Sequence, residues 1–406
     1  MNEVLKTLLD RGFIKQCTDL EKLSNLMDEK KITMYIGADP TGSSLHIGHM
    51  VPIFALKHFA DAGHRAVILI GGGTGRIGDP SGKTEMRKVL SYEQIDENVK
   101  NIKAQLSQFT SVDFANIPNV TFANNSEWLA DLNFIDFMRE IGSQFSVNKM
   151  LTYEAYKKRM ETGLSFLEFT YQILQSYDFL TLHQKYACDL QIGGDDQWGN
   201  ITAGVDLVRR KTGDEVYGLT FPLVTRADGK KMGKSEQGAI FLDPKLTSPY
   251  DFFQYFRNTD DRDVEKMLLT FTFLPIEEIK TLCQGNINVA KERLATEVTG
   301  LVHGKAEAKK ALLAAKEAFY GKGSGDAMPS VKIASAECGE GISVIDLFVK
   351  AKLCSSKSEA RRLIQQGGAF IDDENIADIK TILTIPESKE LTLRAGKKRF
   401  MKVVFE

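Results

Sequence analysis

The sequence has 406 residues, a length that predicts two or three domains at roughly 150 residues per domain. Hydrophobic residues make up 43% and charged residues 26%, which excludes a disordered or collagen-like chain. The net charge of −2 argues against a chain that is basic throughout, although residues 341–406 carry 12 Lys and Arg against 9 Asp and Glu. We find no apolar run long enough for a membrane span and no signal peptide, so neither is expected.

The five cysteines are odd in number, widely scattered and not paired at metal-binding spacing. This pattern is typical of a reducing cytoplasm. We therefore expect no disulfide framework and no protein metal site.

Short apolar runs alternate with longer amphipathic stretches between residues 32 and 224, as in a parallel α/β sheet. The expected strands are 33–37, 66–71, 119–122, 189–192 and 219–224. Apolar residues then recur at helical spacing over 248–318, and residues 320–337 have a linker composition. The last part predicts a helix over 356–366 and strands at 369–371 and 390–393. The expected domains are 1–225 (α/β), 226–322 (all-helical), 323–338 (linker) and 339–406 (small α+β module).

The first motif is a strand and turn, Tyr35-Ile36-Gly37-Ala38-Asp39-Pro40-Thr41-Gly42, followed by His46-Ile47-Gly48-His49 at a helix start. Free N–H groups and the helix dipole make such a helix start an anion site. Two histidines three apart reach one polyanion, and a glycine between them lets a flat base approach. A plain capping turn is the alternative, and a metal pair would lack a third ligand.

A second motif is Asp228-Gly229-Lys230-Lys231-Met232-Gly233-Lys234-Ser235, here called the lysine segment. Lysines in a glycine-containing loop can neutralise charge that develops on a departing pyrophosphate. A solvated lysine turn is the alternative for this loop taken alone.

A glycine-rich stretch over residues 71–84 carries two misleading patterns. Gly73, Gly75 and Gly78 satisfy GxGxxG, but a proline follows where a dinucleotide fold needs a helix. The ending Gly82-Lys83-Thr84 lacks the spacing of a phosphate-binding P-loop. What remains is a loop that brings Asp79 close to a small ligand, or a simple Asp-Pro turn.

The helical stretch 165–178 places Tyr171, Gln175 and Asp178 on one polar stripe among apolar residues that include Phe166. We expect this helix to be largely buried, and a buried polar stripe needs partners. A bound amino acid can supply them, whereas a solvated stripe is the alternative.

The His-Ile-Gly-His and lysine motifs together resemble the two signatures of class I aminoacyl-tRNA synthetases. Tyr35 with Asp178, Asp79, Tyr171 with Gln175, and the run 191–200 resemble more closely the bacterial-type tyrosyl-tRNA synthetases, over essentially the whole chain. The resemblance implies a Rossmann-like parallel-sheet catalytic domain, an all-helical anticodon-side domain and a small α+β RNA-binding module. It also implies a cytoplasmic homodimer.

The resemblance assigns roles to particular residues. Tyr35 and Asp178 would bind the substrate phenol, and Asp79, Tyr171 and Gln175 its amino group. The ATP and adenylate contacts would be Gly37, Asp39, Gly48, Gly194, Asp196 and Gln197. Catalytic contacts to the phosphates would be Thr41, His46, His49, Lys231 and Lys234. Magnesium would arrive with ATP.

Three positions depart from the family pattern. Asp195 stands where Ser is common, and we expect it to cap the following helix. The lysine segment reads Lys-Met-Gly-Lys-Ser, with its lysines intact. Ile36 stands where many relatives have a small or thiol side chain, so no contact is carried over there.

The C-terminal stretch 356–367 resembles the helix of a small RNA-binding module. Arg361, Arg362, Lys397, Lys398 and Arg399 would form a phosphate-facing patch for tRNA. A solvated helix with a charged tail is the alternative, and the acidic run 372–375 replaces the expected hairpin turn.

The expected activity is tyrosine–tRNA ligation: tyrosine and ATP give tyrosyl-adenylate and pyrophosphate, and tyrosine then passes to the terminal ribose of tRNA. The alternatives are another class I synthetase such as that for tryptophan, a shorter HxGH nucleotidyltransferase, or an RNA-binding scaffold derived from a synthetase.

Overall fold

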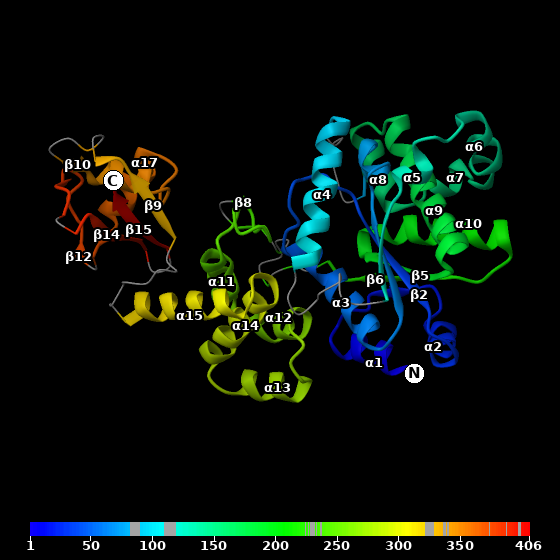
Figure 1. Ribbon diagram of the computed structural model, residues 1–406, viewed down its shortest axis with the longest axis horizontal. Helices are drawn as coiled ribbons and strands as arrows, with labels where there is room; N and C mark the ends of the chain where they lie inside the picture. The colour runs from blue at the N-terminus through cyan, green and yellow to red at the C-terminus, as the bar shows by residue number, and fades with distance from the viewer. Residues whose placement is uncertain are drawn as a thin grey trace. The chain divides into compact units, whose positions relative to one another are not determined.

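The computed structural model describes residues 1–81, 90–108, 119–223, 225, 227, 232, 234–235, 238–320, 329–335, 338, 341–372, 374–386, 388–396 and 399–406. The chain forms two compact units, whose elements are labelled in Figure 1. Unit 1 comprises Met1–Leu246 and Thr259–Ala290, and unit 2 comprises Thr247–Asn258 and Lys291–Glu406. No helix in the described ranges is long and apolar enough to cross a membrane.

A six-stranded sheet in the order β1-β6-β5-β2-β3-β4 lies at the centre of unit 1. Its strands are β1 (Gln16–Cys17), β2 (Thr33–Ala38), β3 (Arg65–Ile70), β4 (Val120–Asn124), β5 (Cys188–Gly194) and β6 (Tyr217–Phe221). The five expected parallel strands are confirmed, with the last shifted to 217–221. The antiparallel edge strand β1 was not expected from the sequence, because two residues carry no periodicity.

The strand order changes direction between β2 and β5, which have β3 and β4 on one side and β6 on the other. Open α/β sheets bind ligands at such a switch point, beyond the carboxyl ends of the strands. A ligand site is therefore expected at the carboxyl ends of β2 and β5.

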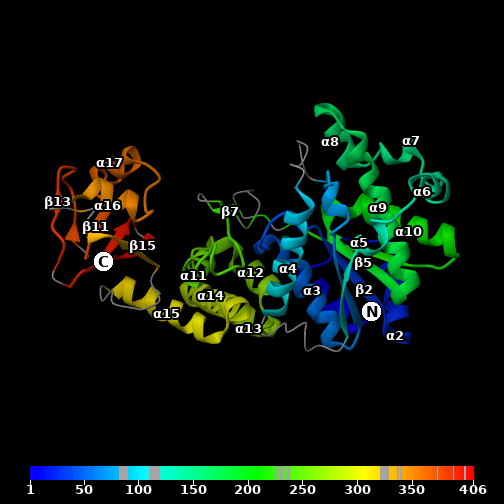
Figure 2. The same ribbon diagram turned by 45° about the horizontal axis from the view of Figure 1, so that its top comes forward.

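Helices cover both faces of this sheet, which explains why β2, β3 and β5 are apolar along most of their length. In Figures 1 and 2, α3 (Met50–Asp61) lies on one side of the strands, and α9 (Phe166–Tyr186) and α10 (Trp198–Thr212) lie on the other. Tyr35, Val67 and Leu69 of the strands share one buried cluster with Phe179 of α9 and Leu207 of α10.

Shorter elements complete the first 246 residues. The α-helices are α1 (Glu3–Asp10), α2 (Leu20–Glu29), α4 (Tyr92–Gln108), α5 (Ser126–Leu129), α6 (Phe134–Glu140), α7 (Val147–Met150) and α8 (Glu154–Thr162). The 3₁₀-helices are η1 (Ile47–His49), η2 (Thr74–Arg76), η3 (Gly142–Gln144) and η4 (Asp195–Gln197), and a two-stranded hairpin consists of β7 (Lys234–Ser235) and β8 (Gly238–Ala239).

The expected helical domain 226–322 is divided between the units. Helices α12 (Val264–Phe271) and α13 (Ile276–Gln284), with η5 (Asp261–Asp263), belong to unit 1. Arg11 explains this placement, since its guanidinium donates to the carbonyls of Leu269 (3.0 Å), Thr272 (3.0 Å) and Leu274 (2.5 Å) at the end of α12. The α/β body thus supplies the C-terminal cap that α12 lacks in its own sequence. The two compact units therefore do not divide at the expected boundary 225/226, and the domain boundaries stay a prediction.

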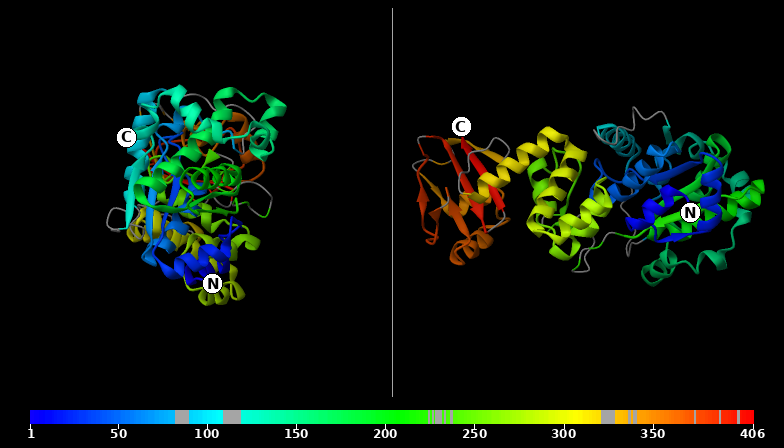
Figure 3. Two further views of the ribbon diagram at one scale, coloured as in Figure 1. Left: turned by 90° about the vertical axis from the view of Figure 1, so that its right-hand side faces the viewer. Right: turned by 90° about the horizontal axis from the view of Figure 1, so that it is seen from below.

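Unit 2 holds α11 (Pro249–Arg257), all but the first turn of α14 (Ile287–His303), α15 (Lys305–Tyr320) and the small C-terminal module. The module consists of β9 (Ser330–Ile333), β10 (Ile342–Ser343), α16 (Val344–Lys350), α17 (Lys357–Gln365), β11 (Ala369–Ile371), β12 (Glu374–Asn375), β13 (Ile382–Leu383), β14 (Glu390–Ala395) and β15 (Arg399–Phe405). Five of its strands form one sheet, β12-β11-β14-β15-β9. Leu347 of α16 and Ile364 of α17 share one buried cluster with Leu393 and Val403 of that sheet. The module is the orange to red part of the ribbon in Figure 3.

The expected module helix is confirmed, with Ser356 as its N-cap and Gly367 at φ +69° just beyond its end. Strand β9 pairs in parallel with β15, although it lies within the linker expected over 323–338. Its apolar residues Val331 and Ile333 pack against the core of the module. The strand therefore belongs to the module and not to the linker.

Candidate active site

Asp178 lies in the middle of α9 and is 2% exposed. Its carboxylate accepts hydrogen bonds from Asn125 Nδ2 (2.9 Å) and Trp128 Nε1 (2.8 Å). Burial raises the pKa of Asp178 to about 8, against the lowering effect of these two donors. The two donors fix the carboxylate in one orientation at the phenol end of the expected substrate site.

Tyr35 in β2 is 1% exposed, and its hydroxyl has no hydrogen-bond partner within the described residues. Its ring packs against Phe179, with the ring centroids 5.2 Å apart. Burial, followed by the charge of Asp178, raises the pKa of Tyr35 well above its ordinary value. A buried hydroxyl without a partner is unfavourable, so this group is poised to bind a polar ligand atom.

Asp39 follows β2 and connects two parts of the site. It accepts from Tyr171 Oη (2.8 Å) and Thr74 Oγ1 (2.7 Å), and Asn125 Nδ2 in turn donates to Thr74 Oγ1 (2.9 Å). A continuous chain of hydrogen bonds therefore runs from Tyr171 through Asp39 to Asp178. Tyr171, expected at the substrate amino group, thus donates to Asp39 in this structure.

The glycine-rich loop serves this arrangement by close packing. A Cβ atom at Gly71 would lie 2.0 Å from Asp39 Oδ1, and one at Gly72 would lie 2.4 Å from Asn124 Oδ1. At Gly75 it would lie 3.1 Å from Pro40 Cδ. Side chains of the protein itself occupy the space where these Cβ atoms would lie. The glycines therefore allow close packing within the protein, in agreement with the expectation that this loop is not a dinucleotide-binding fingerprint. Residues 82–84 lie outside the described ranges.

A second polar chain joins the other expected substrate residues. Gln197 Nε2 donates to Asp79 Oδ2 (2.7 Å), and the Ser81 N–H donates to Asp79 Oδ1 (2.9 Å). Asn200 Nδ2 donates to Gln175 Oε1 (2.9 Å) and Gln197 Oε1 (3.2 Å). The structure thus brings Asp79, Gln175 and Gln197 together, with Asp79 8% exposed.

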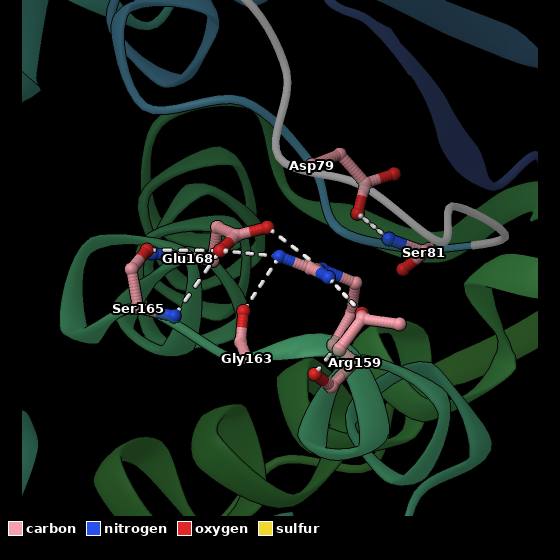
Figure 4. Close-up of polar contacts among 7 residues, drawn as sticks. Asp79, Ser81, Arg159, Gly163, Ser165 and Glu168 are labelled. Atoms are coloured by element: carbon pink, nitrogen blue, oxygen red, sulfur yellow. Dashed lines mark hydrogen bonds and ion pairs between the residues drawn. The ribbon is translucent and has the colours of Figure 1, made fainter.

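The N-terminus of α9 is fixed by a buried ion pair. The Arg159 guanidinium donates to both carboxylate oxygens of Glu168 (3.0 and 3.1 Å) and to the Gly163 carbonyl (2.8 Å), with both charged side chains 3% exposed. Glu168 also completes a capping box with Ser165. Figure 4 shows this cluster with Asp79 and Ser81 nearby. Phe166, expected to be buried, is 66% exposed because it lies on the outer face of this first turn.

The two histidines lie at a helix start, as expected, although His46 is the N-cap in an extended conformation and precedes the helix. His46 Nδ1 accepts from the Gly48 N–H (3.0 Å), and His49 Nδ1 accepts from the His46 N–H (3.1 Å). The rings are 4.0 Å apart. With each Nδ1 accepting, the proton of each neutral ring lies on Nε2, where it can be donated to a phosphate.

The segment after β8 is bonded directly to this helix start. Ile47 N donates to Ile240 O (3.1 Å), Leu242 N donates to Leu45 O (2.9 Å), and His46 pairs with Phe241. The chain that leaves the lysine segment is therefore in register with the histidines. Lys231 lies outside the described residues, and of Lys234 only the backbone, in β7, is described.

The remaining expected nucleotide residues lie in the last part of β2 and β5 or after these strands. Gly37 is exposed, with nothing within 4 Å of the position a Cβ would take, and Thr41 and Gly48 are exposed. Gly194 and Asp196 are half-buried at the end of β5. The position next to Gly48 is occupied by the His46 ring, 2.8 Å from where a Cβ would be.

Asp195 does not cap a helix, contrary to expectation. It is the first residue of η4, Gly194 is the N-cap, and no side-chain cap is formed. Its Oδ1 accepts from Gln16 Nε2 (2.6 Å) and Thr220 Oγ1 (3.0 Å). The carboxylate instead joins the residues after β5 to β1 and β6. Ile36, the other departure within the sheet, is buried at 8% exposure.

In the module, Arg361 and Arg362 are exposed on α17. Arg399 donates to the Leu353 carbonyl (2.9 Å) and lies 3.7 Å from Glu359. Lys397 and Lys398 lie outside the described residues.

Sequence reasoning missed Asn125, Trp128, Thr74 and Asn200, which hold the expected substrate residues in place. Asn125 directly follows β4, and a polar residue at the carboxyl end of a parallel strand was a usable signal. The sequence spacing of Trp128 and Asn200 does not predict their contacts with Asp178 and Gln175.

Comparison with known proteins places this site in a family. Residues 27–320 match the family described as tRNA synthetases class I (W and Y), and residues 322–403 match a tyrosine–tRNA ligase SYY-like C-terminal domain. The chain therefore belongs to the class I tRNA synthetases of the tryptophan and tyrosine group.

The chain is 64% identical over 408 residues to the tyrosine–tRNA ligase of Treponema denticola and 51% identical over 409 residues to that of Borreliella burgdorferi, each covering all of both proteins. A solved C-terminally truncated mitochondrial tyrosyl-tRNA synthetase of Aspergillus nidulans matches 77% of this chain and 93% of its own, with 31% identity and a TM-score of 0.70. Within the group, the chain falls among the tyrosine–tRNA ligases.

Proposed function

We propose that the chain activates L-tyrosine with ATP and transfers it to tRNA(Tyr). The observation that carries this proposal is the unpartnered, buried hydroxyl of Tyr35 near the fixed carboxylate of Asp178. The substrate phenol donates to the Asp178 carboxyl group and accepts from the Tyr35 hydroxyl. Phenylalanine leaves the Tyr35 hydroxyl without a partner, at about 1–3 kcal/mol, and offers no further donor to Asp178.

The second polar chain suits the substrate ammonium. The Asp79 carboxylate provides the opposite charge, and Gln175 and Tyr171 provide oxygen acceptors near it. Asp79 also contributes to the raised pKa of Tyr171, after burial and Asp39, which indicates its proximity. Substrate binding would then redirect Tyr171 from Asp39 toward the ammonium.

ATP would bind beyond the ends of β2 and β5, with contacts from Gly37, Asp39, Gly48, Gly194, Asp196 and Gln197. The tyrosine carboxylate attacks the α-phosphorus, pyrophosphate leaves, and a ribose hydroxyl of tRNA then attacks the acyl carbon. Thr41, His46, His49, Lys231 and Lys234 would stabilise the phosphate charge. Magnesium would enter bound to the ATP phosphates and add positive charge there.

The chain would act as a cytoplasmic homodimer. Four helices of unit 1 carry exposed apolar side chains, namely Phe134 and Ile135 of α6, Val147 of α7, Met160 of α8, and Phe166 and Leu167 of α9. A dimer interface would remove such apolar surface from water. Arg361, Arg362, Lys397, Lys398 and Arg399 of the module would contact tRNA phosphates.

The test is ATP–pyrophosphate exchange with Mg²⁺ and each of the twenty amino acids, for the wild type, Asp178→Ala and the surface control Asp214→Ala. Exchange with tyrosine alone, lost or made unselective only by Asp178→Ala, is the expected result. Exchange with another amino acid would indicate a sister synthetase, and no exchange by folded protein would indicate an RNA-binding scaffold.

A further inference from the structure

The start of the lysine segment is bonded to helix α12. The Ala227 N–H, one residue before the segment, donates to Asp263 Oδ2 at 2.7 Å. Lys266 Nζ, almost one turn further along α12, donates to the Thr225 carbonyl at 3.3 Å. Two contacts from one helix therefore hold the chain immediately before the segment.

Asp263 is an unusual N-cap. An aspartate at this position ordinarily accepts from an N–H of its own first helical turn. Asp263 makes no such side-chain cap, although it is the N-cap of α12. Its carboxylate is 6% exposed and is directed to a backbone group 36 residues earlier. A buried carboxylate bonded to a backbone N–H is a strong, charge-assisted contact.

The far end of the segment is also fixed. Backbone hydrogen bonds join Ile240 and Leu242 to Ile47 and Leu45, on either side of His46. The described residues on the two sides of the segment, Ala227 and Ile240, are therefore each hydrogen-bonded. Lys231 lies outside the described residues and follows Ala227 by four positions, so the Asp263 contact fixes the chain a short way before this lysine in the sequence.

We propose that Asp263 is a positioning residue for ATP activation: it acts through the Ala227 N–H to fix the start of the lysine segment, so that the lysines meet the ATP phosphates. This inference rests on the proposed function. Misplacement of a catalytic group by 1 Å can cost about 10²-fold in rate. Loss of the Asp263 contact should therefore slow activation and leave tyrosine binding, at the other end of the site, unchanged.

The test measures single-turnover formation of tyrosyl-adenylate by full-length Asp263→Ala, Asp263→Ser and Asp263→Asn. The Ala and Ser variants should activate at least about tenfold more slowly per active site, with tyrosine Kd within twofold of wild type. The Asn variant keeps an acceptor oxygen and should lose less than about threefold. Ser retains a good N-cap residue, so it keeps the test usable where the Ala variant does not fold.

Two controls separate the possible failures. Glu265→Ala removes an exposed carboxylate from the same helix and should leave the rate unchanged. Lys234→Ala tests the lysine segment itself: a normal rate there would overturn the segment's proposed role. A slow Lys234→Ala beside normal Asp263→Ala and Asp263→Ser would overturn only the inference about Asp263. Rates that fall only in proportion to tyrosine affinity, or a lower burst amplitude with a normal rate constant, would also overturn it, because they indicate a purely structural role.

Discussion

Replacement of Tyr35 by Phe should make the substrate-free protein more stable and its tyrosine complex weaker. The Tyr35 hydroxyl is buried without a partner in the described structure. Its removal relieves a penalty of about 1–3 kcal/mol in the free protein. The wild type escapes the same penalty only when the phenol binds, so the variant should bind tyrosine about 5- to 160-fold more weakly. The two effects share one origin and should match in size with opposite sign.

The matched control is Tyr156→Phe. Tyr156 is also 1% exposed, but its hydroxyl donates to the Phe169 carbonyl at 3.0 Å. The same chemical change should therefore lower stability by about 0.5–1.5 kcal/mol, because it removes one hydrogen bond to a helix carbonyl. It should leave tyrosine affinity near wild type.

Thermal unfolding and tyrosine titration by intrinsic fluorescence measure both quantities for each variant. A change of 1 kcal/mol should shift Tm by about 2–4 °C in a unit of this size. If Tyr35→Phe lowers Tm as Tyr156→Phe does, the hydroxyl has a partner and the reasoning fails. Unchanged tyrosine affinity in Tyr35→Phe would show that the hydroxyl does not bind the phenol.

Three further predictions concern charge and packing. Burial raises the pKa of Asp178 to about 8 from an ordinary 3.8, so between these pH values the native chain retains a proton that the unfolded chain releases. The contribution of Asp178 to the free energy of unfolding should therefore fall as pH rises from 4 to 8. The Tm of Asp178→Asn, measured relative to wild type, should rise across the same range. Glu168→Gln leaves the Arg159 guanidinium buried without a counter-charge and should cost about 3–5 kcal/mol in denaturation, whereas Glu307→Gln, in an exposed pair with Lys310, should cost less than about 1 kcal/mol. Gly71→Ala should abolish pyrophosphate exchange because its Cβ would lie 2.0 Å from Asp39 Oδ1. The control Gly300→Ala should keep exchange, because its Cβ would lie at an ordinary 3.8 Å from Ala308. Normal exchange by Gly71→Ala would refute this account of the packing.

Much of the fold follows from the sequence because buried parallel strands are continuous apolar runs, as in β3 (Arg65–Ile70). The helix stripe of Tyr171, Gln175 and Asp178 was equally predictable, since helical periodicity fixes which residues share a face. The partners of that stripe were not predictable. Asn125 and Trp128 reach Asp178 through the β4 end of the sheet, and such contacts depend on strand order.

The division into compact units was not predictable for a related reason. Periodicity identifies α12 as a helix but does not say which body it packs on. Three hydrogen bonds from Arg11 and the ring contact between Phe54 and Phe271 join it to unit 1. Asp195 shows the same limit at the level of one side chain: a helix-start position predicts a cap, but Gln16 and Thr220 lie close enough to bind it. Tertiary contacts, and not local helix-capping propensity, determine the hydrogen-bond partners of Asp195.

The bonds between residues 45–47 and 240–242 have a consequence for synthesis of the chain. All six strands of the unit 1 sheet are complete by Phe221, so a nascent chain of that length holds the whole sheet and both histidines. The backbone that registers the histidines is made later, and the α12 carboxylate that holds Ala227 later still. Because domains generally fold as units, unit 1 can complete the phosphate side of its site only after residues 240–263 have been synthesised.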